Sequence, residues 1–223
     1  LFGIGTYHWV RGNIRAALNA YEKMSSLADK SNDESLHLVA DQHVGAALVT
    51  HGDVARGRLI ARRAIETYDF AKHGHLIAMY GQDIGVGAVT FPNFGEAYHG
   101  CFGTASANAE EAVKWALATN HPFTLTLAYS MAGLALAIIG DAARADDFAD
   151  RCLRIGEEQY LPFYSAWAQV GRAIIRRVNG EAEAALPLFE EAIAVFEMAG
   201  GSGQAPLLLT EVARATLAVG DFH

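Results

Sequence analysis

The sequence predicts an all-α fold: a right-handed α–α superhelix of about five and a half helical hairpins, forming one domain over residues 1–223. Three observations predict it. Glycines recur at regular intervals between apolar segments, small residues stand at fixed distances from those glycines, and the chain has 22 glycines but only five prolines. A repeat of this length is the signature of stacked helix pairs.

Each recurring glycine is followed by a polar or helix-capping residue. Glycine closes a helix in the left-handed conformation, and Asn, Asp or Thr caps the next helix, so each pair indicates the turn of a hairpin. The pairs are Gly12-Asn13, Gly52-Asp53, Gly103-Thr104, Gly140-Asp141, Gly180-Glu181 and Gly220-Asp221. By subtraction, successive glycines lie 40, 51, 37, 40 and 40 residues apart.

The turns divide the chain into a first and a second helix per hairpin. We expect first helices over residues 1–11, 33–51, 83–102, 122–139, 161–179 and 204–219. Second helices are expected over 13–30, 53–70, 104–119, 141–158 and 181–199. Pro122 and Pro162 then stand in the first turn of a helix, where proline is tolerated. The 51-residue interval leaves about ten extra residues, 71–82, between two hairpins.

Small residues keep the same register as the glycines. Five of the six residues seven positions before them are small: Gly5, Gly45, Glu96, Gly133, Ala173 and Ala213, with Glu96 the exception. Five positions after them stand Ala17, Gly57, Asn108, Ala145 and Ala185. Small residues at fixed places let two helix backbones approach closely, and the fifth, ninth and twelfth positions after each glycine share one helical stripe.

This pattern resembles the tetratricopeptide repeat, with its small residue, glycine seven positions on, alanine after twelve and aromatic residue after sixteen. Ala17-x3-Tyr21 and Ala185-x3-Phe189 match it best. The family's usual period is roughly 34 residues, whereas three intervals here are 40. We therefore expect each helix to be about one turn longer.

A second resemblance covers nearly the whole chain. Tyr80-Gly81-Gln82-Asp83-Ile84-Gly85-Val86 is similar to a segment in the helical C-terminal regions of large bacterial signalling proteins, although Ile84 replaces an expected proline. Those proteins carry a class III adenylate/guanylate cyclase or a winged-helix DNA-binding domain, then an ATPase and tetratricopeptide-like repeats. The resemblance implies that the chain is a piece of such a protein. Tyr80, Gln82 and Asp83 would then contact a ligand or another domain; alternatively, Asp83 caps a helix and Tyr80 packs the insertion down.

Composition and motifs argue against several function classes. The formal net charge of −8 is opposite to that of a non-specific nucleic-acid binder. We find no phosphate-binding loop and no H-E-x-x-H zinc motif, so we expect neither catalysis by this segment nor a cofactor. The longest apolar run, 125–140, is shorter than the ~18 residues of a membrane span. Cys101 and Cys152 lack metal-like spacing, which favours a reducing, cytoplasmic location.

Two groups of residues have competing interpretations. His73 and His75 flank Gly74, but a metal site needs a third ligand, so we interpret them as part of a polar loop. Clustered arginines could form a patch for an acidic partner or a solvated helix face. These are Arg56, Arg58, Arg62 and Arg63 in one second helix, and Arg172, Arg176 and Arg177 in one first helix.

The binding surface is expected on the first helices, which line the inner face of such repeats. Counting back from each glycine places a set of polar and aromatic residues there: Gln42, Thr90, Asn93, Ser130, Trp167, Arg177, Thr210 and Arg214. A groove with these groups could hold an extended peptide or a helix, and Arg177 with Arg214 could pair a carboxylate. Alternatively, Trp167 belongs to the core between repeats, and the other polar residues lie on a solvated face without a ligand. The alternatives for function are an oligomerisation module or an enzyme with an unrecognised site.

Overall fold

The computed structural model describes residues 1–220, whose regular elements are all helical, so the predicted all-α, repeat-like character is confirmed. The first helices are α1 (Phe2–Val10), α3 (Glu34–His51), α7 (Ile84–Tyr98), α9 (Pro122–Ile139), α11 (Pro162–Val178) and α13 (Ala205–Val219). The second helices are α2 (Ile14–Ser31), α4 (Val54–Thr67), α8 (Phe102–Thr119), α10 (Ala142–Gln159) and α12 (Ala182–Met198). Asp221, expected in the last turn, lies outside the described residues.

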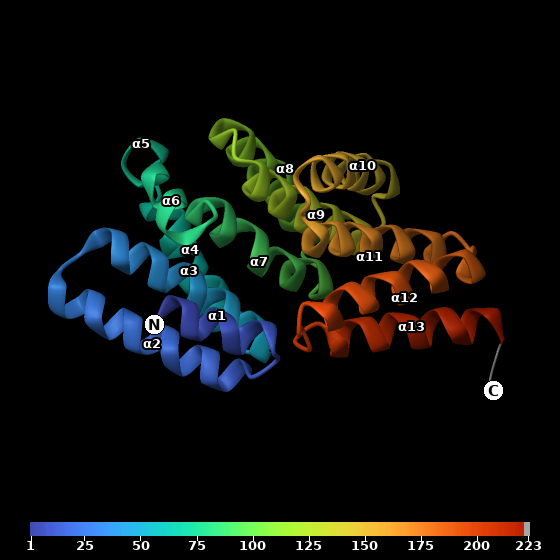
Figure 1. Ribbon diagram of the computed structural model, residues 1–223, viewed down its shortest axis with the longest axis horizontal. Coiled ribbons are helices and arrows are strands. Elements are labelled where there is room, and N and C mark those ends of the chain that lie inside the picture. Colours follow the sequence, from blue (N-terminus) through green and yellow to red (C-terminus); the bar gives the residue numbers. More distant parts are fainter. Residues whose placement is uncertain (221–223) are drawn as a thin grey trace.

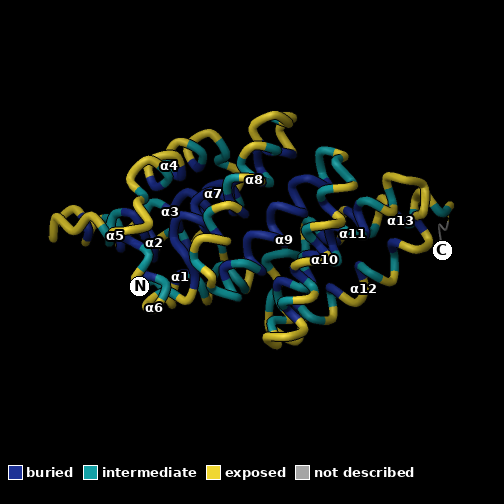
Figure 2. Tube along the Cα trace, turned by 90° about the horizontal axis from the view of Figure 1, so that it is seen from above, coloured by how far each residue is buried: buried dark blue, intermediate teal, exposed yellow. Residues whose placement is uncertain are grey.

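The hairpins stack through their first helices. Helix α7 packs on α3, α9 on α7, and α11 on α9, while each second helix packs on the first helix of its own hairpin (Figure 1). The buried residues accordingly follow α3, α7 and α9 through the middle of the molecule (Figure 2). By contrast, α10 is buried only along the stripe Ala145, Ala149, Cys152 and Gly156. The core therefore runs lengthwise along the first helices.

Helix α9 is the centre of this core. Within the described residues it is the one helix long and apolar enough to cross a membrane, and 72% of it is buried inside the protein. It packs against α7, α8, α10 and α11. Its apolar character is that of a helix surrounded by other helices.

The turn of the third hairpin differs from the prediction. Gly100, not Gly103, adopts the left-handed conformation, with φ of 77°, and Gly103 lies inside α8. The N–H of Cys101 donates to the carbonyl of Glu96 at 3.0 Å, as expected after a left-handed residue that ends a helix. The prediction was wrong because Cys101, unlike Thr104, is no capping residue. With Gly100, the intervals become 40, 48, 40, 40 and 40 residues.

The corrected register makes the hairpins alike. The residue seven positions before each turn glycine lies on the first helix. It touches the backbone of the second helix at the residue five positions after the same glycine. A Cβ on Gly45 would lie 3.1 Å from the carbonyl oxygen of Gly57, and one on Gly133 would lie 3.4 Å from that of Ala145. In the third hairpin, Asn93 donates a hydrogen bond from Nδ2 to the same carbonyl position, at Ala105 (2.9 Å). One close helix–helix contact therefore recurs with the repeat.

The stripe on the second helices also becomes regular. The fifth, ninth and twelfth positions after the glycine are all buried in every described hairpin. The fifth positions are Ala17, Gly57, Ala105, Ala145 and Ala185. The ninth positions are Tyr21, Ala61, Ala109, Ala149 and Phe189, and the twelfth positions are Met24, Ala64, Ala112, Cys152 and Ala192. The predicted Asn108 and Trp115 do not belong to this stripe, because the third hairpin was counted from the wrong glycine.

The extra residues form helical turns and not an open polar loop. They fold as α5 (Phe70–His73), the 3-10 helix η1 (Gly74–Leu76) and α6 (Ile77–Tyr80). His73 is buried: its Nδ1 accepts a hydrogen bond from the Asp69 N–H (3.0 Å), and its Nε2 lies 3.4 Å from Glu34 Oε1. The insertion is thus held to the body of the protein, which corrects the loop interpretation of this histidine.

The two ends of the stack touch. The N–H groups of Ser202 and Gly203, between α12 and α13, donate to the carbonyl of Val10 at 3.0 and 3.1 Å. The Ser202 hydroxyl donates to the carbonyl of Arg11 at 2.6 Å. Figure 1 shows the α12–α13 loop next to the end of α1. We call these contacts the clasp; they join segments 191 residues apart.

Candidate functional site

Half of the predicted groove residues are buried. Gln42, Thr90, Asn93 and Ser130 are at most 1% exposed, so they do not line an open groove. In the corrected register, three of them (all but Asn93) stand ten residues before their glycine, where one first helix packs on the next. The hydroxyls of Thr90 and Ser130 bond carbonyls of their own helices, at 2.9 and 3.1 Å. Asn93 faces the second helix of its hairpin.

Trp167 and Thr210 remain at least partly accessible. The Trp167 ring packs against Phe196 with centroids 5.1 Å apart, which matches its alternative interpretation as part of the core between repeats. Thr210 is exposed on α13, and its hydroxyl donates to the carbonyl of Pro206 at 2.7 Å. Both lie on the C-terminal first helices, so the accessible part of the predicted surface is confined to α11 and α13.

Arg177 and Arg214 do pair a carboxylate, and it is the protein's own. Glu211 is 1% exposed, and its Oε2 accepts from Arg177 Nε (3.1 Å) and Nη2 (2.9 Å). Its Oε1 accepts from Arg214 Nη1 at 2.6 Å. A buried carboxylate needs such partners, because desolvation without them is costly. Two guanidinium groups facing one carboxylate leave a surplus of positive charge where α11 and α13 meet.

Tyr98, at the end of α7, adjoins this cluster. Burial raises the pKa of its hydroxyl to about 12, and the negative charge of Glu211 adds to the effect. The phenol therefore stays neutral. Together, Tyr98, Arg177, Glu211 and Arg214 bring three helices to one polar cluster with a net positive charge.

Asp83 is a helix cap, as the alternative interpretation of the matched segment proposed. Its Oδ1 accepts from the N–H of Val86 at the start of α7 (2.8 Å), and its Oδ2 accepts from the hydroxyl of Tyr68 (2.5 Å). Its own N–H donates to the hydroxyl of Thr124 at 3.1 Å. Burial raises the pKa of the Asp83 carboxyl, while these hydrogen bonds oppose the rise.

The other two matched residues also make packing contacts. The ring of Tyr80 meets that of Phe2 edge to face, with centroids 5.0 Å apart, which holds α6 against α1. Gln82 is 8% exposed and lies against Gly87, where an added Cβ would be 3.1 Å from its Nε2. The segment thus positions the insertion and the start of α7.

The arginine clusters are largely paired within the chain, which fits the solvated-face interpretation. Arg172 contacts Asp146 and Asp150, and Arg176 contacts Glu181. On α4 the ion pairs are Arg56–Asp53, Arg58–Glu96 and Arg63–Asp41. The exposed pairs among these contribute little to stability, whereas Glu96, the partner of Arg58, is buried. All of them reduce the positive charge offered to a partner.

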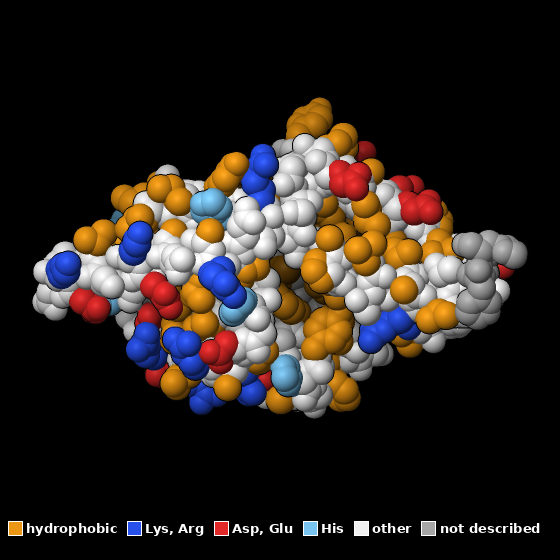
Figure 3. Space-filling model, turned by 90° about the horizontal axis from the view of Figure 1, so that it is seen from below, with side chains coloured by type: hydrophobic (Ala, Val, Ile, Leu, Met, Phe, Trp, Pro, Cys, Tyr) orange, Lys and Arg blue, Asp and Glu red, His pale blue; other side chains and the backbone are white. Residues whose placement is uncertain are grey.

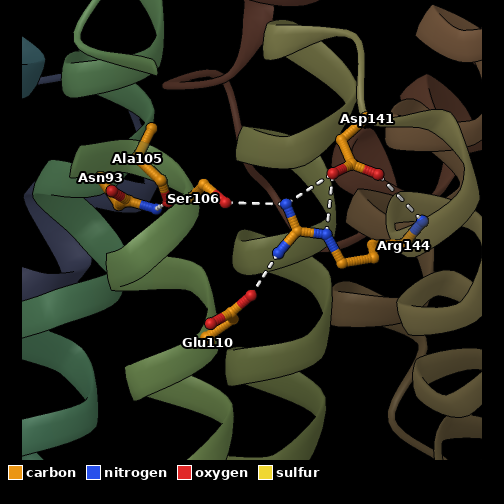
Figure 4. Close-up of polar contacts among 6 residues, drawn as sticks. All are labelled: Asn93, Ala105, Ser106, Glu110, Asp141 and Arg144. Carbon is orange, nitrogen blue, oxygen red and sulfur yellow. Dashed lines mark hydrogen bonds and ion pairs between the residues drawn. The ribbon is translucent and has the colours of Figure 1, made fainter. Parts of the chain in front are cut away.

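Sequence reasoning missed Arg144, which joins neighbouring second helices. Its guanidinium donates to the Ser106 hydroxyl (2.7 Å) and to Glu110 on α8, and also to Asp141, the cap of its own helix α10 (Figure 4). Its partners are 34 and 38 residues away in the sequence, close to one repeat.

Two hollows lie elsewhere on the surface of the described residues. One of about 510 Å³ is bordered by Asp29, His37, Asp41 and Arg63, and one of about 590 Å³ lies beside the start of α2. Across residues 1–220, no three His, Cys, Asp or Glu side chains are grouped as for a metal ion. Figure 3 shows a further recess near the middle of one face, with hydrophobic side chains around it.

Apolar side chains are exposed on α13, the helix that carries Glu211 and Arg214 of the positive cluster. Leu209, Thr210, Ala213, Arg214 and Leu217 are all exposed along it, and we call these five residues the α13 surface. No protein-family model and no curated protein matches the chain. The candidate site is therefore defined by geometry: the α13 surface together with the Arg177–Glu211–Arg214 cluster beside it.

Proposed function

We propose that the chain is a protein–protein interaction and regulatory scaffold, folded as a right-handed superhelix of the tetratricopeptide kind. The recurring contact between the first and second helices of each hairpin carries this proposal. Hairpins that contact chiefly their neighbours form an extended surface, which is the usual basis of binding by helical repeats. In line with the resemblance of its segments, we propose that it serves a cytoplasmic bacterial signalling protein with a cyclase or DNA-binding domain.

The chemistry of the candidate site supports an acidic polypeptide as partner. Arg177 and Arg214 together carry one positive charge more than Glu211 neutralises. Arginine pairs carboxylates well because its planar group offers several donors. The net charge of −8 over the whole chain does not favour nucleic acid.

A second candidate function is self-association. Apolar side chains are exposed at both ends of the stack, with Ile4 and Tyr7 on α1 and Leu209 and Leu217 on α13. Exposed apolar side chains gathered on one surface commonly mark interfaces. Light scattering over a range of protein concentrations separates the two candidates, because a scaffold for a different partner stays monomeric.

Selection of peptides displayed on phage, with the full chain as bait, tests the proposed function. We expect acidic, amphipathic peptides to be enriched, and Arg214→Glu to weaken their binding by roughly tenfold, a change of about 1.4 kcal/mol. The matched control is Arg62→Glu, an exposed arginine on α4, which should leave binding unchanged. Failure to enrich any peptide above an unrelated helical bait would contradict the proposal.

A further inference from the structure

The turn that leads from one hairpin to the next has a left-handed residue at a fixed place. Twenty positions after the turn glycine, just beyond the second helix, four hairpins have Asn32, Asn120, Tyr160 and Gly200, with φ of 51°, 48°, 55° and 69°. Glycine and asparagine tolerate this conformation, whereas a bulky side chain is disfavoured in it. Tyr160 is therefore the exception among the four.

The Tyr160 side chain does not stabilise the fold in return. It is 89% exposed, and within residues 1–220 neither another aromatic ring nor an arginine packs on its ring. Tyr7, which is also exposed, has the guanidinium carbon of Arg11 at 4.8 Å from its ring centre. A residue that breaks a local rule without a structural gain is expected where the chain has a function.

Two carboxylates precede this tyrosine at the end of α10. Glu157 and Glu158 are exposed, and neither makes an ion pair within the part of the chain that the structure describes. The helix dipole disfavours negative charge at a helix C-terminus, so these residues break a second local rule. Arg154, one turn earlier, balances at most one of the two charges. The end of α10 therefore keeps a net negative charge beside an open aromatic ring.

The exposure of Tyr160 does not depend on where the stack ends. Its turn lies between the equivalent turns at Asn120 and Gly200, forty residues before and after it. Helix α11, which follows it, packs against α9, α10 and α12. The neighbouring hairpins on both sides are thus present, and they leave the ring open.

We propose that Tyr160, Glu157 and Glu158 form a docking site for an arginine in a basic segment of a partner polypeptide. The guanidinium lies over the phenol ring, as that of Arg11 lies over Tyr7, and pairs with a carboxylate at the end of α10. Arginine suits both contacts because its planar group stacks on aromatic rings and carries several donors. The net charge of −8 favours the approach of a basic partner.

This site goes beyond the proposed function, because it takes the opposite charge at another place. Tyr160 precedes the first residue of α11, and Arg177 lies in the last turn of that helix. At 1.5 Å per residue the two lie roughly 25 Å apart along the helix axis. One chain can therefore hold an acidic segment at Arg177 and a basic segment at Tyr160 at the same time.

A short peptide with two arginines separated by glycine, acetylated and amidated at its ends, is a suitable probe. Titrated into the ¹⁵N-labelled full chain, it should shift the amide signals of residues 157–161. The same peptide with citrulline, a neutral isostere of arginine, should not. Tyr160→Asn should weaken binding roughly fivefold, about 1 kcal/mol. Tyr160→Phe should not, because the ring remains.

A matched pair of charge variants separates this site from general attraction to an acidic chain. Glu157→Gln combined with Glu158→Gln should weaken binding, because the carboxylates beside the ring are lost. Glu190→Gln combined with Glu191→Gln removes the same charge from two adjacent, exposed positions of α12 and should change binding little. Equal losses in both double variants would overturn the inference.

Thermal unfolding distinguishes a role in binding from a role in the fold. Because asparagine suits the left-handed position, Tyr160→Asn should raise Tm by about 2–4 °C while it weakens binding. A fall in Tm would show that Tyr160 stabilises the turn, and the inference would be wrong. It would also be wrong if Tyr160→Asn bound the peptide as wild type does, or if about 10 mM peptide shifted no signal in residues 157–161.

Discussion

The side-chain amide of Asn93 donates a hydrogen bond to the backbone carbonyl of Ala105, with Nδ2 and O 2.9 Å apart (Figure 4). The two residues occupy positions where other hairpins bring Gly45 to Gly57 and Gly133 to Ala145. A larger, polar residue is accommodated in α7 because its amide replaces direct backbone contact with a hydrogen bond. The same helix pairing is thus maintained by two different means.

Replacement of Asn93 by alanine tests this contact. Asn93→Ala should lower the free energy of unfolding by about 1 kcal/mol, the typical net contribution of one hydrogen bond. Urea unfolding followed by circular dichroism measures it. Asn108→Ala is the control, because Asn108 lies outside the buried stripe and alanine favours helices. Equal or greater stability of Asn93→Ala would show that the hydrogen bond does not hold the hairpin together.

Gly203→Ala should loosen the clasp. A Cβ on Gly203 would lie 2.7 Å from the carbonyl oxygen of Trp9, so the loop must move away from the end of α1. We expect faster hydrogen exchange at the Ser202 and Gly203 amides. Gly3→Ala is the control: a Cβ there meets nothing within 4 Å, and alanine in a helix adds about 0.5–1 kcal/mol of stability. Unchanged exchange in Gly203→Ala would contradict the clasp.

Stability should fall with decreasing pH because of His43. Burial lowers its pKa from 6.5 to about 4. Its ring packs on Phe2 and Tyr21, and its Nδ1 lies 2.8 Å from the carbonyl of Val39. Since the folded pKa lies below the unfolded value, the unfolded chain binds the proton first. The contribution is complete above pH 6.5 and is lost as the pH falls towards 4.

Unfolding titrations of wild type and His43→Leu at several pH values measure this contribution. Each pH unit between these pKa values costs up to about 1.4 kcal/mol. The stability of the wild type should therefore fall more steeply than that of the variant over this range. Other groups titrate in both proteins, so the comparison isolates His43. Parallel curves would contradict the assignment.

The two cysteines should differ in reactivity. Cys152 is buried in α10 between carbonyls, and burial raises the pKa of its thiol to about 12, which suppresses the reactive thiolate. Cys101 is partly exposed. A chromogenic disulfide reagent should therefore modify one thiol per native chain and two in denaturant. Modification of Cys152 in the native protein, located by mass spectrometry, would show that α10 opens readily.

The period of the repeat could be predicted because glycine has a definite role. Left-handed turns at Gly12, Gly52, Gly140, Gly180 and Gly220 are where the sequence placed them. The third turn was misplaced because two glycines lie three residues apart and only the second precedes a capping residue. The structure has its left-handed turn at Gly100. The sequence pattern required a capping residue after the glycine, so it did not identify this turn.

The prediction that Gln42 and Ser130 line an open groove was wrong for a physical reason. Position counting tells which residues share a helix face, but not how tightly the next helix covers that face. Gln42 and Ser130 lie on faces closed by neighbouring first helices. The pairing of Arg177 with Glu211 joins residues 34 positions apart, and no local pattern signals it. Contacts between residues far apart in the sequence therefore determine which of the predicted groove residues are accessible.

The most direct test of the scaffold function is hydrogen exchange on the full chain with and without a display-selected peptide. The account predicts added protection of the amides of α11 and α13, around Arg177, Glu211 and Arg214, with little change in α2 and α4. Loss of that protection in Arg214→Glu would support the proposed contact. Saturating peptide that changes exchange nowhere in residues 1–220 would contradict the proposal that this stack of helical hairpins binds polypeptides.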